Sequence, residues 1–206
     1  MSKNGRKNLI LMTAGVFGMG VFLSLLLKAG YGTDTSSFMN SSIASRLGLP
    51  LGPVMVCVNA LLFIVQLIWG RSLIGIGTVA NMTLIGFTSD FCTGIWQTYL
   101  PDHIFSAQPE RIIIFIIALA GFLISAALYM NSESGLAPYD AIPVMLSSAM
   151  HLPFHAVRTA WDFLAIAAGL AAGGRLTAGT FIMALTLGSA VSFTGRILKA
   201  GKNEIS

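Results

Sequence analysis

Long apolar stretches alternate with short polar ones along the chain. Crossing about 30 Å of hydrocarbon takes about 20 helical residues. Polar residues interrupt the third long stretch at Asn81, Thr83 and 88–90, but it must still be helical, because lipid cannot satisfy free backbone groups. We predict an all-α membrane protein with six transmembrane helices, near 9–29, 51–69, 73–95, 111–130, 153–172 and 177–197.

Two further segments, 34–47 and 137–150, are too short and too polar to span a membrane. Asp34 and Asp140 lie in their first turns, where a carboxylate suits the positive end of a helix dipole. Pro138 suits a first helical position. We predict two short helices that lie at the membrane or dip into it, and a role as plain surface helices with no binding function stays equally open.

The chain contains an internal repeat. A shift of 103 residues places equivalent residues over one another: Gly18 on Gly121, Gly32 on Gly135, Leu49-Pro50 on Leu152-Pro153 and Asn59 on Asp162. After a one-residue deletion, Gly77-Thr78 falls on Gly179-Thr180. We therefore predict a single membrane domain over 1–206, with repeat one at about 9–98 and repeat two at about 111–198. Because each copy has three spans, the second copy enters from the opposite side, as in the inverted repeats of many secondary transporters.

The placement of basic residues supports this topology. With the N-terminus in the cytoplasm, seven Lys or Arg residues lie at cytoplasmic ends of the spans and four lie at outer ends, which fits the positive-inside tendency. We predict a multi-pass protein of the bacterial cytoplasmic (inner) membrane with both termini cytoplasmic. The basic head and the apolar run 9–27 resemble a signal peptide, but the run is long and has a repeat partner at 112–129, so we expect a retained first span.

The composition agrees with a membrane location. The chain is 55% hydrophobic and 10% charged, whereas soluble domains carry about 25% charged residues. Cys57 and Cys92 both lie in apolar stretches, so we expect buried small residues and no disulfide framework. The basic residues lie at segment ends and form no single patch, so no nucleic-acid partner is expected.

The start of the fifth span carries the main group of ionisable residues. His151, His155, Arg158 and Asp162 are spaced by four, three and four residues, which places them on one helical face. An aspartate or arginine near the bilayer centre costs roughly 2.5–3.5 kcal/mol on insertion scales. We therefore expect Arg158 and Asp162 to face the protein interior and to pair. The pair either lines a substrate or proton path or is a buried ion pair that fixes helix packing.

Asn59 is the counterpart of Asp162 in the first copy, and Gln66 lies two turns further along the same face. A site on a pseudo-two-fold axis would place polar residues at equivalent depths in both copies. Interhelical hydrogen bonds, worth about 0.6 kcal/mol each, are the alternative. We predict a polar cavity between the copies lined by Asn59, Asp140, Arg158 and Asp162, with the N-terminal ends of the two short helices close by.

Other chemistries have less support. The glycine-rich turns 71–78 and 173–180 could present amides to an anion or could be short connections where only glycine fits. No P-loop lysine is present, so a nucleotide site is not expected. His151 and His155 have metal-like spacing, but no Glu lies between them and no third ligand is evident. We expect no metal, no cofactor and no enzymatic activity.

The motifs of the second copy resemble those of a bacterial membrane protein family. The run 135–141 (Gly-Leu-Ala-Pro-Tyr-Asp-Ala), the Arg158…Asp162 pair and Gly173-Gly174…Gly179-Thr180 are similar to the YczE-like branch of the YitT/YczE family. Ala137 and Asp162 stand where that family often has glycine and glutamate, and the first copy lacks the proline. The resemblance implies an integral membrane protein and makes Pro138, Asp140, Arg158 and Asp162 the candidate functional residues.

The first functional hypothesis is a small secondary transporter or channel-like carrier of a small solute. Arg158 and two helix N-termini would suit a small organic anion, although Asp34 and Asp140 partly cancel that field. The alternatives are a non-transporting accessory membrane protein that assists a partner enzyme or complex, and a substrate-capture subunit of an importer. The expected partners are the lipid bilayer and a small-molecule solute, and a homo-oligomer stays open.

Overall fold

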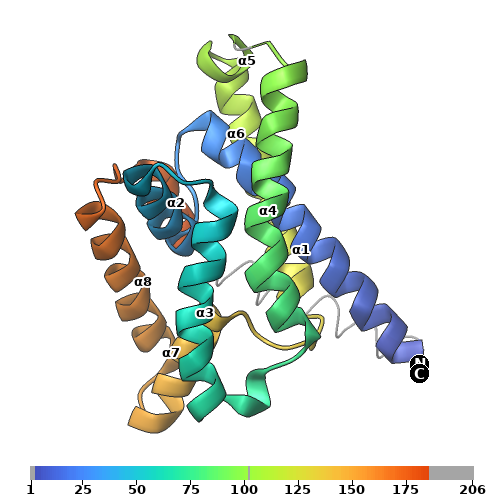
Figure 1. The fold of residues 1–206 in the computed structure, drawn as a ribbon, viewed down its shortest axis with the longest axis vertical. Helices are drawn as coiled ribbons and strands as arrows, with labels where there is room; N and C mark the ends of the chain where they lie inside the picture. The colour runs from blue at the N-terminus through green and yellow to red at the C-terminus, as the bar shows by residue number, and fades with distance from the viewer. Residues whose placement is uncertain (1–2, 102, 186–206) are drawn as a thin grey trace.

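The computed structural model describes residues 3–101 and 103–185, and this part of the chain is helical without strands (Figure 1). The predicted all-α class is therefore confirmed. In chain order the elements are α1 (Lys3–Ala29), α2 (Thr35–Leu47), α3 (Leu51–Trp69), the 3-10 turn η1 (Arg71–Leu73), α4 (Ile76–Tyr99), α5 (His103–Ser106), α6 (Glu110–Met130), α7 (Pro138–Met150) and α8 (Phe154–Ala171). A further helical stretch covers 178–185.

Among the described residues, three helical segments are long and apolar enough to cross a membrane, and they indicate a membrane protein. They are Gly5–Ala29 of α1, all of α3 and all of α6. Helices α4 and α8 occupy the predicted third and fifth spans but carry more polar residues. Helix α4 begins at Ile76 and not at 73, because 71–73 form the separate turn η1. Residues 186–197 of the predicted sixth span lie outside the described part.

The outer surface of the helices is apolar. On α6, Ile113, Ile116 and Ile117 are exposed, whereas Phe122 and Tyr129 on the opposite face are buried. A side of a helix that exposes only large apolar residues is suited to lipid and not to water. Apolar residues therefore cover both faces of such a helix, and only packing separates the lipid face from the core.

This ambiguity explains one wrong expectation. Cys57 is exposed on α3, although the sequence predicted a buried position, while Cys92 on α4 is buried as expected. Both thiols are free, and the sequence predicted no disulfide framework.

Helices α1 and α6, the first helices of the two repeats, pack against each other in antiparallel directions. The Ala29 carbonyl, at the end of α1, accepts a hydrogen bond from Nε of Arg111, at the start of α6. Near the middle of α1, Gly15 lies against Tyr129, close to the end of α6. The glycines let the two backbones approach closely, as small residues commonly do between membrane helices.

The contacts between α1 and α6 are reciprocal with respect to the repeat. Gly18 packs against Ser125, and Gly121 packs against Phe22. Under the shift of 103 residues, Gly18 corresponds to Gly121 and Phe22 corresponds to Ser125. The glycine position of the first copy therefore packs against the Phe22/Ser125 position of the second copy, and the same contact occurs again with the two copies exchanged.

A second reciprocal contact joins the loop of each copy to a helix start in the other. The Gly77 N–H donates to the Ser134 carbonyl at 2.8 Å, and the Gly179 N–H donates to the Tyr31 carbonyl at 2.9 Å. Ser134 lies between α6 and α7, and Tyr31 lies between α1 and α2. Each loop therefore anchors a helix start in the opposite repeat, that of α4 in one case and that of the helical stretch 178–185 in the other.

The short helices α2 and α7 lie toward opposite ends of α3 (Figure 1). Both also pack against α8, so each short helix contacts the second long helix of its own copy and that of the other copy. Their N-terminal ends lie together in the interior, where the site described below is formed.

Candidate functional site

The start of α2 is fixed by its own sequence. Asp34 is the N-cap, and its carboxylate Oδ2 accepts a hydrogen bond from the Ser37 N–H at 3.1 Å. This satisfies one of the four free N–H groups at a helix start. The sequence placed Asp34 within the first turn, and the structure places it one residue before the helix.

The start of α7 uses different residues in the equivalent place. Ala137 is the N-cap, Pro138 is the first helical residue, and Asp140 lies in the first turn. Proline at this position loses no hydrogen bond, because the first N–H groups of a helix have no intrahelical partner. Both short helices thus begin in the interior with an aspartate at or near their first residue.

Two glycines bring these helix starts into the interior. Gly32 has φ +132° and Gly135 has φ +101°, conformations that residues with a Cβ rarely adopt. A Cβ on Gly32 would collide with Thr180, and a Cβ on Gly135 would collide with Gly75 and Thr78. The repeated glycine therefore serves a close approach of backbones just before each short helix.

Arg158 on α8 connects Asp140 and Asp162, two of the acidic residues that the sequence predicted for the site. Its Nη1 lies 2.6 Å from Asp140 Oδ1 on α7, and its Nε lies 3.1 Å from Asp162 Oδ2 one helical turn further on. The side chains of Arg158 and Asp162 are 19% and 13% exposed. The predicted interior ion pair is therefore present, and the contact with Asp140 extends it to a second helix.

Asp162 is enclosed by donors. Its Oδ1 accepts hydrogen bonds from the hydroxyls of Thr35, at 2.7 Å, and Tyr139, at 2.8 Å. Burial and then the Asp162 charge raise the pKa of Tyr139, so this hydroxyl stays protonated as a donor. With Arg158 on the other oxygen, the Asp162 carboxylate is fully satisfied and ties α8 to both short helices.

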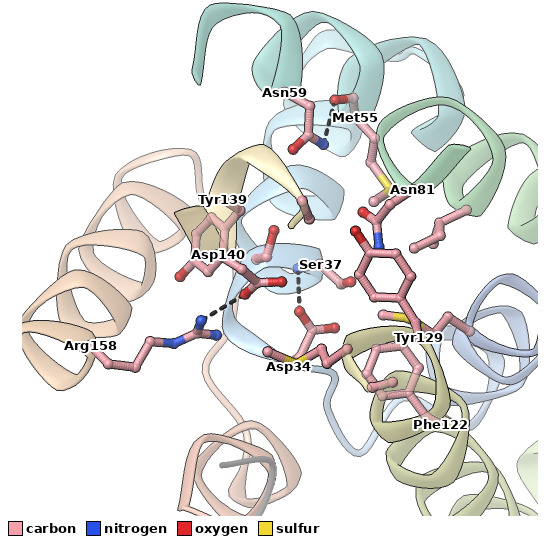
Figure 2. A pocket seen from close by; sticks show the side chains of 16 residues that line it. Asp34, Ser37, Met55, Asn59, Asn81, Phe122, Tyr129, Tyr139, Asp140 and Arg158 are labelled. Carbon is pink, nitrogen blue, oxygen red and sulfur yellow. Dashed lines mark hydrogen bonds and ion pairs between the residues drawn. The ribbon is translucent and has the colours of Figure 1, made fainter. Parts of the chain in front are cut away.

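A cavity of about 50 Å³ lies next to this network, between the two short helices and the long helices α1, α3, α4 and α6 (Figure 2). A water molecule needs roughly 10–15 Å³ on such a measure, so the cavity has room for a few waters or one small ion. Its polar lining residues are Asp34, Ser36, Ser37, Asn59, Asn81, Tyr129, Tyr139, Asp140 and Arg158. Its apolar walls include Met19, Met55, Ile85 and Phe122.

Several polar atoms around this cavity have no hydrogen-bond partner among the described residues. Oδ1 of Asp34 is buried and unpaired. Asn59, 4% exposed, uses its Nδ2 to donate to the Met55 carbonyl at 2.9 Å, which leaves its side-chain oxygen free. Asn81, 7% exposed, lines the same cavity, and Figure 2 shows its amide turned toward this space.

The structure brings most of the predicted site residues together. Asn59, Asp140 and Arg158 line the cavity, and the N-terminal ends of α2 and α7 lie beside it. Asp162 does not line the cavity but holds Arg158, which does, and Pro138 is fully buried and does not line the cavity either. Their role in binding stays a prediction.

Two lining residues were noted in the sequence without a site role. Asn81 was treated only as a polar interruption of a span, and Asp34 only as a partner of a helix dipole. The signal that could have found Asn81 is its polarity inside an apolar helix, where an amide must face protein or a cavity.

The predicted absence of a histidine metal site stays a prediction. His151 ends α7 in a left-handed conformation with φ 54°, and His155 is exposed at the start of α8. Within the described residues, no three His, Cys, Asp or Glu side chains are arranged to hold a metal ion.

Residues 6–196 match the family described as Family of unknown function (DUF6198), and the chain belongs to this family. The chain is also similar to an uncharacterized protein of Haemophilus influenzae (strain ATCC 51907 / DSM 11121 / KW20 / Rd). The two are 24% identical over 188 residues, which cover 90% of this chain and 81% of the relative. No solved structure matches the chain.

Proposed function

We propose that this member of the DUF6198 family is a small secondary transporter or channel-like carrier of a small solute. The observation that carries the proposal is the cavity at the converging N-termini of α2 and α7, lined by charged and amide side chains inside an apolar shell. Short or broken helices at matching places in two repeats commonly mark the binding site of a transporter.

The proposal includes six spans arranged as two inverted repeats in the bacterial inner membrane, with both termini cytoplasmic. The antiparallel packing of α1 and α6 supports the inverted relation, because these helices are equivalent in the two copies. The reciprocal bonds of Gly77 with Ser134 and of Gly179 with Tyr31 support it independently. Alternating access could then proceed by rocking of one repeat against the other around a fixed site. Kinship with the YczE-like branch is a further part of this proposal and rests on the motif resemblance.

The environment of Arg158 bears on the type of solute. The sequence suggested a small organic anion because of this arginine and the two helix N-termini. Arg158 already contacts Asp140 and Asp162, so two carboxylates pair with its single positive charge before any ligand binds. An anion would have to displace one of these carboxylates, which makes a neutral or cationic solute the better candidate.

Flux into proteoliposomes tests the proposal. Wild-type protein should move at least one small metabolite faster than protein-free vesicles, and Asp162→Asn should slow it, because Arg158 and the two short helices lose a common anchor. Glu110→Gln, which removes an exposed carboxylate at the start of α6, is the control and should leave flux unchanged. Equal flux by wild type and Asp162→Asn would remove Asp162 from the mechanism. No flux for any small cation, anion or neutral metabolite would favour an accessory membrane protein or an importer subunit.

A further inference from the structure

The charges around the cavity do not balance within the described residues. Three carboxylates, on Asp34, Asp140 and Asp162, lie at or beside the cavity, and the one guanidinium there, that of Arg158, pairs only with Asp140 and Asp162. The N-terminus of a helix carries roughly half a positive elementary charge, and α2 and α7 both begin here. Together these terms leave about one negative charge in the interior of a bundle of largely apolar helices.

Asp34 is the residue that carries this excess. Asp162 is held by three donors, and Asp140 is paired with Arg158 at 2.6 Å. Asp34 accepts only the Ser37 N–H on Oδ2, and its Oδ1 is buried without a partner. Burial, more than any other factor, raises the pKa of the Asp34 carboxyl above its ordinary value, and the nearby Asp140 adds to this. A buried carboxylate without a countercharge is costly unless a proton or another cation neutralises it.

The amides opposite Asp34 supply a second and independent observation. Nδ2 of Asn59 donates to the Met55 carbonyl, while the side-chain oxygen of Asn59 and the amide of Asn81 make no hydrogen bond to the described residues. Both side chains are more than nine-tenths buried and line the cavity with Asp34 and Asp140 (Figure 2). Buried polar groups in proteins are nearly always paired with protein, ordered water or a bound ligand, so these amides offer free contacts to whatever occupies the cavity.

We propose that this cavity binds one small monovalent cation, held by the Asp34 carboxylate with oxygen atoms of Asn59, Asn81 and Asp140. The proposal rests on the proposed carrier function and names the class of its solute or coupling ion. Hard cations prefer carboxylate and carbonyl oxygens, which these four side chains provide. A volume of about 50 Å³ suits an alkali ion with a water molecule or a small ammonium group. About one unbalanced negative charge favours a monovalent over a divalent ion.

Cation binding is measured on the purified full-length protein in detergent by thermal unfolding. Na⁺, K⁺ and methylammonium are each titrated as chlorides at constant ionic strength against N-methyl-D-glucamine, which is too large for the cavity. At least one small cation should raise the melting temperature saturably. A larger effect of Na⁺ or K⁺ indicates a site for an alkali ion, and a larger effect of methylammonium indicates a site for an ammonium group. Equal melting temperatures in all four salts would overturn the proposal.

Variants locate the site. Asp34→Asn keeps an N-cap side chain that can accept from Ser37, so α2 should still form. It should weaken cation binding by about tenfold or more, as expected for loss of a charge-assisted contact. Asn81→Leu removes only an amide from a membrane helix and should also weaken binding. Glu110→Gln should bind as wild type. Undiminished binding by both Asp34→Asn and Asn81→Leu would refute the assignment.

The two proposals fail separately. Saturable cation binding in detergent without flux into vesicles would keep the cation site and remove the carrier function. Flux that persists without small cations and is unchanged in Asp34→Asn would keep the carrier and remove the cation site.

Discussion

Arg158 Nη1 and Asp140 Oδ1 lie 2.6 Å apart, and this contact joins α8 to the first turn of α7. Asp162 holds the same guanidinium from one turn away. Removal of Arg158 would therefore leave two partly buried carboxylates without their countercharge.

We predict that Arg158→Met lowers the free energy of unfolding by about 3 kcal/mol, because breaking a buried ion pair from one side strands the remaining charges. The triple variant Arg158→Met/Asp140→Asn/Asp162→Asn should be more stable than the single variant. Thermal unfolding of both proteins in the same detergent measures this. A triple variant less stable than Arg158→Met would show that the carboxylates do not depend on Arg158 for their burial.

Gly135→Ala should strongly destabilise the protein. The residue has φ +101°, and a Cβ would collide with Gly75 and Thr78, so backbone strain and overlap act together. We expect a loss of about 2–3 kcal/mol or failure to fold. Gly32→Ala should lose a similar amount of stability, since a Cβ on Gly32 would collide with Thr180 at the equivalent place in the other repeat.

Gly94→Ala is the control for these two variants. Gly94 is inside α4 with open space around its Cα and no positive φ. Alanine is a better helix former than glycine by about 0.8–1 kcal/mol, so this variant should be as stable as wild type or more stable. If all three glycine variants lose the same stability, the contacts of Gly32 and Gly135 are not the cause.

The sequence predicted helix positions well where residue chemistry marks the ends. Helix α3 begins after Pro50 and ends before Gly70, and its predicted range 51–69 is the observed one. The start of α4 was predicted less accurately, because residues 70–75 form η1 and an extended turn whose shape depends on contacts with Ser134. The four-residue helix α5 was missed, since one turn in a polar connection has no periodicity to detect.

The site was predictable only in part for a similar reason. The pairing of Arg158 with Asp162 follows from a spacing of four on one helix. The contact of Arg158 with Asp140 does not, because a left-handed turn at His151 separates the two helices and decides their approach. Asn81 reaches the cavity through the packing of α4 against α1 and α3, which no local pattern encodes.

Without small cations, the contribution of Asp34 to the stability of the protein should fall as pH rises from about 4. Burial raises the pKa of Asp34 in the folded state above its ordinary 3.8. Asp140 acts in the same direction, while the Ser37 contact and Arg158 oppose it. The folded state therefore binds this proton more tightly than the unfolded chain does. Its stabilising effect is complete below the unfolded pKa and is lost as pH rises through the folded one.

The measurement is the melting temperature against pH in N-methyl-D-glucamine buffer. The difference between wild type and Asp34→Asn isolates this carboxyl from the other ionisable groups of the chain. Wild type should lose stability relative to Asp34→Asn as pH rises, and a binding cation should restore it at the upper end. A constant difference across the range would mean that Asp34 keeps its ordinary pKa.

The final prediction concerns topology. The proposed six-span inverted arrangement places α5 outside the cell and η1 in the cytoplasm, so His103 and Arg71, both exposed, should lie on opposite sides. In a Cys57→Ser/Cys92→Ala background, a membrane-impermeant thiol reagent should label His103→Cys in intact cells. Arg71→Cys should be labelled only after permeabilisation. Only one span, α4, separates the two positions, so this pair tests whether that polar helix crosses the membrane. Labelling of both positions from the same side would show that α4 does not cross the membrane, and the second copy would then not enter the membrane from the opposite side.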